Sequence, residues 1–115
     1  MDKTIDRYKI ENHEQWRDWC STIPPIKFEP SWRVVVAPPF GGAMARFRVV
    51  KGEASVSVYL DVFDRLGYYG KPYWEVYPYN DDVYRCDMSE TDLLTDAISK
   101  SIRQQTIQLN KNNHA

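Results

Sequence analysis

Carboxylate side chains come closest to a catalytic pattern in this chain of 115 residues. The candidates are Asp61, Asp64, Glu75, Asp81 and Asp82. Two or three carboxylate oxygens that converge on one ion would suit a metal-dependent hydrolase. A nuclease-like strand pair would also place a lysine two residues after the glutamate, and Tyr77 occupies that position after Glu75. A hydrolase using Asp61, Asp64 and Glu75 therefore stays as an alternative, and strand-end and turn acids are the preferred interpretation.

Other catalytic motifs each lack a member. His13 and His114 are the two histidines, one near an expected helix start and one in the last residues of the chain. Cys20 and Cys86 are far apart and neither has a CxxC partner, which predicts separate reduced thiols. Gly41-Gly42 lacks the spacing and the lysine of a phosphate-binding loop. The sequence thus predicts no catalytic residue, no metal, no cofactor and a non-enzymatic protein.

Aromatic side chains are the remaining chemical signature. Aromatic residues make up 14% of the chain, with eight tyrosines and four tryptophans. Seven of the aromatic residues fall between positions 68 and 84: Tyr68, Tyr69, Tyr73, Trp74, Tyr77, Tyr79 and Tyr84. Tyrosine and arginine are favoured at the centres of protein interfaces, and the same pair can stack bases and hold phosphates. A binding surface is therefore the main functional expectation.

Strands must position these side chains, and period-2 alternation predicts four of them. The clearest covers residues 54–63, with Val56, Val58, Leu60 and Val62 on one side and Ser55, Ser57, Tyr59 and Asp61 on the other. Further strands are expected at about 32–37, 44–49 and 73–79. Turns at 51–53 and 80–82 and loops at 37–43 and 64–72 separate them, and such short links favour antiparallel pairing.

Two helices are predicted beside the sheet. Asn12 and Gln15 form a capping box for a first helix, which Pro24-Pro25 ends. Ser89 is the expected cap of a second helix, whose buried side would carry Leu94, Ile98, Ser101, Ile102, Gln105 and Leu109, widened by Leu93 and Ala97.

These elements predict a single α+β domain over residues 1–115. It has an antiparallel sheet of three to five strands, and an N-terminal and a C-terminal helix cover one face of that sheet. Residues 1–11 are read as a weakly patterned arm and 110–115 as a frayed tail. The predicted core face of the sheet carries Phe47, Val49, Val56, Val58, Leu60, Trp74 and Val76.

The sheet face opposite this core is the candidate partner-binding site. Strand register places Arg46, Arg48, Tyr59, Tyr73, Glu75, Tyr77 and Tyr79 there, with Tyr68 and Tyr69 on the adjacent loop and Asp81 and Asp82 in the next turn. Two alternatives stay open. The tyrosines reflect strand propensity on a face that the arm or the loops cover, or they form a homodimer interface.

Charge is distributed unevenly along the chain. Residues 31–51 carry +4 and residues 61–96 carry −6, within a net charge of −1. A pI near 6.1 and acids beside the tyrosines count against nucleic acid, and RFRVV at 46–50 does not match an RNA-recognition motif. The preferred partner is another protein, for example a nucleic-acid-binding one whose basic groove the acids would engage. A single-stranded nucleic-acid-binding module is the alternative.

Size and composition suggest a narrower hypothesis. Single-domain inhibitors that phages and mobile elements make against host proteins, including CRISPR effector nucleases, are similar in kind: small, motif-poor, acidic and aromatic. This likeness is one of composition, and no motif carries it. No run of residues approaches the ~18 apolar positions needed to span a bilayer, and MDKTIDRYKIEN lacks the apolar core of a signal peptide. The expected location is the cytoplasm, without membrane contact.

Overall fold

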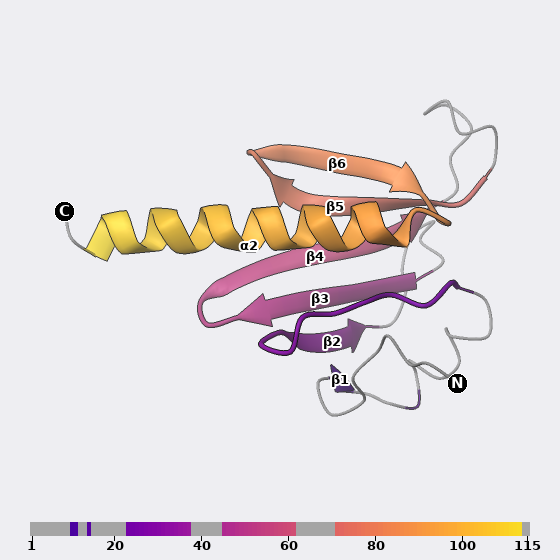
Figure 1. The fold of residues 1–115 in the computed structure, drawn as a ribbon, viewed down its shortest axis with the longest axis horizontal. Coiled ribbons are helices and arrows are strands. Elements are labelled where there is room, and N and C mark those ends of the chain that lie inside the picture. The colour runs from indigo at the N-terminus through magenta and orange to yellow at the C-terminus, as the bar shows by residue number, and fades with distance from the viewer. Residues whose placement is uncertain (1–9, 12–13, 15–22, 38–44, 62–70, 114–115) are drawn as a thin grey trace.

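One sheet and one long helix account for most of the backbone that the structure describes. The computed structural model describes residues 10–11, 14, 23–37, 45–61 and 71–113 (Figure 1). Strands β2 (Arg33–Ala37), β3 (Ala45–Lys51), β4 (Ala54–Asp61), β5 (Tyr73–Tyr79) and β6 (Asp82–Asp87) pair in sequence order, each antiparallel to the next. The two-residue strand β1 (Ile10–Glu11) pairs with β2 in parallel, and helix α2 (Thr91–Asn113) follows β6. The predicted antiparallel sheet and C-terminal helix are confirmed.

Turn chemistry sets the hairpins of this sheet. Gly52 has a φ of 60° in the tight turn between β3 and β4, as predicted for a residue without a Cβ atom. Asn80 and Asp81 have φ values of 52° and 61° between β5 and β6, the left-handed backbone that a two-residue hairpin turn requires. The second turn leads into β6, a strand that the sequence reading did not predict.

The core lies on the side of the sheet that faces α2. The seven residues predicted for this face, Phe47, Val49, Val56, Val58, Leu60, Trp74 and Val76, are all buried. Aromatic rings join the sheet to the segment before it, because Phe28 packs edge-on against Phe47 at 5.7 Å between centroids, and Phe47 packs against Trp74 at 6.1 Å. The Trp74 indole donates its N–H to the Met88 carbonyl at 3.0 Å, which satisfies its polar atom within the core.

Helix α2 covers this core and extends beyond the sheet at its C-terminal end (Figure 1). Its buried side carries Leu94, Ala97, Ile98, Ser101 and Ile102, as predicted. Leu93 was expected to widen the buried side, but it is 43% exposed because it lies at the border of the packed stripe. The helix begins at Thr91, so Glu90 and not Ser89 is the residue that precedes it, and the Ser89 hydroxyl donates to Asp87 Oδ2 at 2.6 Å instead.

An extended segment shares the core face with α2. Ile23, Ile26, Phe28 and Trp32 are buried there. The Thr95 hydroxyl of α2 donates to the Lys27 carbonyl at 2.8 Å and ties the two together. The predicted N-terminal helix and arm lie almost entirely outside the described residues.

Candidate binding face

The side of the sheet turned away from α2 is the candidate site. Alternation along the strands brings together the residues that we call the open face: Arg46, Arg48, Tyr59, Glu75, Tyr77 and Arg85. Tyr77 is 53% exposed, Arg48 and Arg85 are exposed, and the other three are half-buried. Five of these six residues were predicted for this face from the sequence.

A polar row crosses the open face from β3 to β6. Strand register aligns Arg46 with Tyr59, Tyr59 with Glu75, and Glu75 with Arg85. The Arg46 guanidinium carbon lies 6.0 Å from the centre of the Tyr59 ring, within cation–π range. Arg85 Nε donates to Glu75 Oε2 at 2.9 Å. The row therefore consists of two cross-strand contacts, Arg46 with Tyr59 and Arg85 with Glu75, placed side by side by the register of β4 and β5.

A second row carries the most accessible aromatic ring. Arg48 is aligned with Ser57, and Ser57 with Tyr77. Because serine is small, it separates the arginine and the tyrosine without covering either. An exposed phenol and an exposed guanidinium thus flank a small polar residue near the middle of the sheet.

Asp61 adds a buried carboxyl group to the edge of this face. It is 7% exposed and follows Tyr59 by two positions on β4, so its side chain points to the same side. Burial, followed by a hydrogen bond with Glu75 and the charge of Glu75, raises the pKa of Asp61 to about 7. The two carboxyl groups therefore retain one proton between them up to near-neutral pH.

Two tyrosines predicted for this site present no surface on the open face. Tyr73 is on the expected side of β5, but it is 0% exposed and so presents no surface to a partner. Tyr79 lies on the α2 side, because β5 has one extra residue relative to β6 between Val76 and Tyr79. The Tyr79 ring packs against Tyr84 at 5.1 Å and against the core. The predicted side is therefore confirmed for Tyr73, whose ring is nevertheless buried, and wrong for Tyr79.

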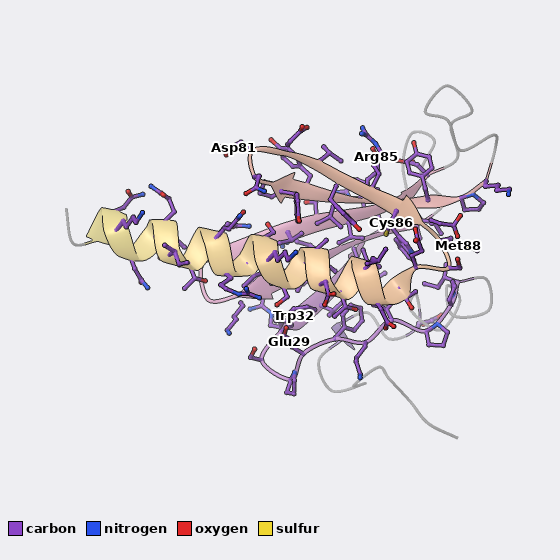
Figure 2. The ribbon with its side chains drawn as sticks, turned by 45° about the horizontal axis from the view of Figure 1, so that its top comes forward. Glu29, Trp32, Asp81, Arg85, Cys86 and Met88 are labelled. Carbon is purple, nitrogen blue, oxygen red and sulfur yellow. The ribbon has the colours of Figure 1, made fainter. Side chains whose placement is uncertain are left out.

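The predicted acidic residues are also separated from the open face. Asp81 lies at the tip of the β5–β6 hairpin (Figure 2), and Asp82 pairs with Tyr79, whose ring faces the core. Both aspartates are exposed. Tyr68, Tyr69 and Asp64 lie outside the described residues.

Arg85 is the open-face residue that sequence reasoning missed. It lies on β6, where only alternate positions, Tyr84 and Cys86, turn toward the core, and where aspartates occupy both ends. The alternation of Val83, Arg85 and Asp87 against Tyr84 and Cys86 was the available signal.

Metal and thiol chemistry find little support in the described part of the chain. No group of three His, Cys, Asp or Glu side chains within it is placed to hold a metal ion. Cys86 is a buried free thiol, and its Sγ lies 3.7 Å from the Glu90 carbonyl. Burial, followed by the charges of Glu90 and Asp87, raises the pKa of Cys86 to about 12.

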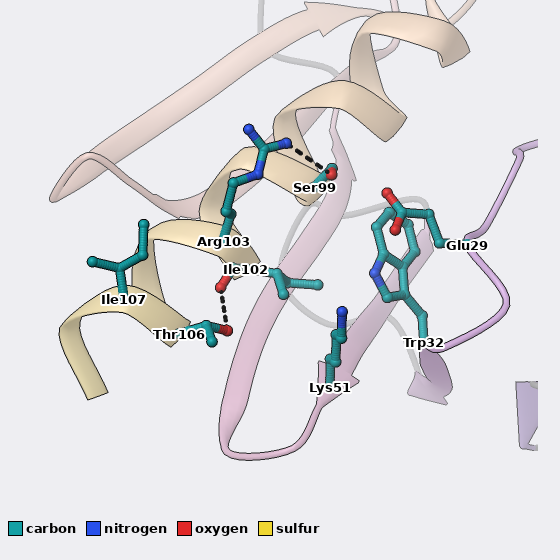
Figure 3. Close-up of a pocket in the computed structure, with 8 residues that line it drawn as sticks. All are labelled: Glu29, Trp32, Lys51, Ser99, Ile102, Arg103, Thr106 and Ile107. Carbon is teal, nitrogen blue, oxygen red and sulfur yellow. Dashed lines mark hydrogen bonds between the residues drawn. The ribbon is translucent and has the colours of Figure 1, made fainter. Parts of the chain in front are cut away.

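A pocket of about 360 Å³ opens on the other side of the molecule, between α2, the end of β3 and the segment before β2 (Figure 3). Its residues are Glu29, Trp32, Lys51, Ser99, Ile102, Arg103, Thr106 and Ile107. Thr106 donates to the Ile102 carbonyl at 2.8 Å, and Arg103 donates to Ser99 at 3.4 Å, so both hydroxyl groups are already bonded. The rim carries both signs of charge, which makes this pocket a weaker candidate than the open face.

No protein-family model, curated protein or solved structure gives a significant match to this chain. Among the residues that the structure describes, no helix has the length and apolar character needed to cross a bilayer.

Proposed function

We propose that this protein is a non-enzymatic binding module that docks on another protein through the open face. The observation that carries the proposal is the 53% exposure of Tyr77, next to arginines on a sheet face that α2 does not cover. A large exposed ring is costly to leave in water and supplies stiff contact area when a partner covers it. Arginine adds planar, multidentate hydrogen bonding at the same place.

The partner surface that fits this face is acidic. Arg46, Arg48 and Arg85 lie on it, together with the exposed Arg33 at its β2 edge, against the carboxylates of Glu75 and Asp87 while Asp61 is protonated. Charge complementarity of this kind raises association rates and excludes partners of like charge. This proposal replaces the expectation that acidic residues engage a basic groove.

Single-stranded nucleic acid is the second candidate, because the same arginines could neutralise phosphates. A stacking platform, however, needs successive exposed rings. Tyr77 is the one aromatic residue among those described with more than half of its surface exposed, whereas Tyr59 lies beside the Arg46 guanidinium and is half-buried. This arrangement favours a protein partner.

The narrower proposal is that the partner is a host defence nuclease, for example a CRISPR effector, and that the module inhibits it. Its support is the size and motif-poor composition of the chain. A homodimer through the open face is a competing proposal for the same residues. Sedimentation of the purified protein at micromolar concentrations separates the two, because a dimer would occupy the open face without any other protein.

Affinity capture from the native host with two matched variants tests the proposal. Arg48→Glu combined with Tyr77→Ala should lose the partner, because truncating an interface hot spot costs at least ~2 kcal/mol, roughly 30-fold in affinity. Arg103→Glu combined with Ile107→Ala makes a matched charge reversal and a matched truncation of a large side chain at exposed positions of α2. This control variant should retain the partner.

The affinity of the captured protein, purified and measured against all three forms, completes the test. Equal affinity for wild type and for the open-face variant would contradict the proposal. Binding to an oligonucleotide that weakens at least 10-fold between about 50 and 200 mM salt, and that the open-face variant loses, would favour the second candidate.

A further inference from the structure

Asp61 is a nearly buried acid that the proposed binding chemistry does not use. It lies at the end of β4, 7% exposed, and the described groups around it on that side of the sheet come from strands β3 to β6. These neighbours are Arg46 on β3, Tyr59 on β4, Tyr73 and Glu75 on β5, and Arg85 and Asp87 on β6. Helix α2 packs against the opposite face, so it contributes no charge to this cluster.

The contacts of Glu75 decide where the proton of the pair resides. Arg85 donates to Glu75 Oε2 at 2.9 Å, which stabilises the ionised form of Glu75. Asp61 lies diagonally across from Glu75, because β4 and β5 pair Tyr59 with Glu75 and Asp61 with Tyr73, and the two carboxyl groups are hydrogen-bonded. Since two touching carboxylates repel each other, Asp61 holds the proton and donates it to Glu75.

We infer that Asp61 and Glu75 form a proton-operated switch in the open face: with one proton the pair keeps Glu75 in the row between Tyr59 and Arg85, and release of that proton to solvent displaces Glu75 from the row. The inference goes beyond the proposed function, because the switch operates whether or not a partner binds. It adds a pH-dependent state to the surface on which a partner would dock.

Exposure determines which of the two carboxylates moves. The Glu75 and Arg85 side chains retain 17% and 38% of their exposure, and Arg85 lies on β6, the last strand of the sheet. Asp61 is 7% exposed and its backbone pairs with β5. Glu75 and Arg85 can therefore turn outward together, while Asp61 stays in place as a carboxylate.

The pKa of Asp61, about 7 against an ordinary value of 3.8, places this change near neutral pH. The folded protein holds this proton more tightly than the unfolded chain does. The stabilisation is therefore complete below about pH 4 and is lost as the pH rises to about 7.

Nuclear magnetic resonance of the full-length protein between pH 4.5 and 9 tests the switch directly. The carboxyl carbon of Asp61 should titrate with a midpoint near 7, and the Nε resonance of Arg85 and the ring resonances of Tyr59 should shift with the same midpoint. Titration of Asp61 near pH 4 would overturn the inference. So would an Arg85 resonance that stays constant while Asp61 titrates.

A variant of Asp61 and a matched control test the switch without relying on the titration of a single resonance. Asp61→Asn keeps a hydrogen-bond donor and carries no charge, so the Arg85 resonance should become independent of pH between 5 and 9. The melting temperature of the wild type should fall as the pH rises over that range. In Asp61→Asn this fall should be absent. Asp96→Asn, at an exposed position of α2, is the control and should keep the wild-type profile.

Glu75→Gln serves if Asp61→Asn does not fold. Removal of the neighbouring charge should move the Asp61 midpoint to lower pH, because one of the causes of its elevation is gone. Wild-type pH profiles in both variants would refute the switch.

Discussion

Asp61 and Asp87 lie on either side of Tyr73 in one cross-strand row, yet their carboxyl groups behave in opposite ways. Burial raises the pKa of Asp61, whereas hydrogen bonds from the Ser89 hydroxyl and backbone N–H lower the pKa of Asp87. The stabilisation from Asp87 is therefore present above about pH 4 and is lost on further acidification. That from Asp61 is lost between about pH 4 and 7, so the two contributions occupy separate pH ranges.

Cys86 provides a test of burial at the same scale. Its pKa of about 12 and its exposure of 3% leave almost no accessible thiolate at pH 8. Iodoacetamide should therefore modify Cys86 at least 100-fold more slowly in the native protein than in urea, as followed by mass spectrometry of the peptide that contains it. Glu90→Gln should change this little, because burial is the larger cause. Equal rates in the native and unfolded states would contradict the buried placement.

At the scale of elements, α2 repairs a gap in the sheet. The β4–β5 pairing runs from Ser57–Tyr77 to Asp61–Tyr73, so Ser55, at the start of β4, is not paired with β5. Gln105 of α2 fills the gap: the Ser55 N–H donates to its Oε1 at 3.0 Å, and its Nε2 donates to the Ser55 carbonyl at 2.8 Å. The side-chain amide therefore takes the two hydrogen bonds that a neighbouring strand would have supplied.

Gln105→Ala should lower the free energy of unfolding by about 2 kcal/mol, because it leaves a partly buried donor and acceptor without partners. Gln105→Glu, ionised at neutral pH, keeps the acceptor for the Ser55 N–H and loses the donor to the Ser55 carbonyl, so it should also lower the free energy of unfolding. Gln108→Ala, three residues on and exposed, is the control and should cost less than about 0.5 kcal/mol. Urea unfolding measures all three, and equal values for the alanine variants at 105 and 108 would contradict this role.

The β5–β6 turn offers a gain in stability. Asp81 has a φ of 61°, which a residue with a Cβ atom adopts at a cost and glycine does not. Asp81→Gly should therefore raise the free energy of unfolding by about 0.5–1 kcal/mol, and Asp81→Val should lower it. Asp81→Gly also tests whether the turn belongs to the binding surface. An unchanged affinity for the partner would show that the partner does not contact this turn. A destabilised Asp81→Gly protein would contradict the turn geometry.

The local sequence pattern was sufficient to predict the strands and the helix whose core-facing positions are all apolar. Strands β2 to β5 and the buried side of α2 follow from alternation and from helical spacing, and so do Arg46, Arg48, Tyr59, Glu75 and Tyr77 as neighbours on one face. β6 was missed because it has only two core-facing positions between charged residues.

The remaining differences depend on contacts between strands. The bulge that turns Tyr79 inward exists only in the register of β5 against β6, and the Asp61–Glu75 pair only in that of β4 against β5. Neither feature can be predicted from the sequence of a single strand.

At the scale of the whole molecule, the two faces of the sheet differ in burial and in charge. Arginines gather on the open face, whereas Asp81, Asp82, Asp92 and Asp96 lie exposed on the hairpin and on α2. A net charge of −1 therefore conceals a molecule with a basic face, which would steer an acidic partner toward the open side. Because screening acts over about 10 Å at 0.1 M salt, association with such a partner should slow as salt is added.

Two neighbouring residues of β3 allow the contributions of the two faces to stability and to partner binding to be measured separately. Phe47 is 1% exposed in the core and Arg48, the next residue, is exposed on the open face. Phe47→Ala should cost about 3–5 kcal/mol of unfolding free energy, because it removes a ring from a packed aromatic cluster. Arg48→Ala with Tyr77→Ala should cost less than about 1 kcal/mol and yet abolish partner binding. Phe47→Leu, which preserves most of the volume, keeps the comparison available if the alanine variant does not fold, and it should bind the partner normally. A large loss of stability in the open-face variant would show that this face belongs to the folding core, and would remove the argument that it is kept for a partner.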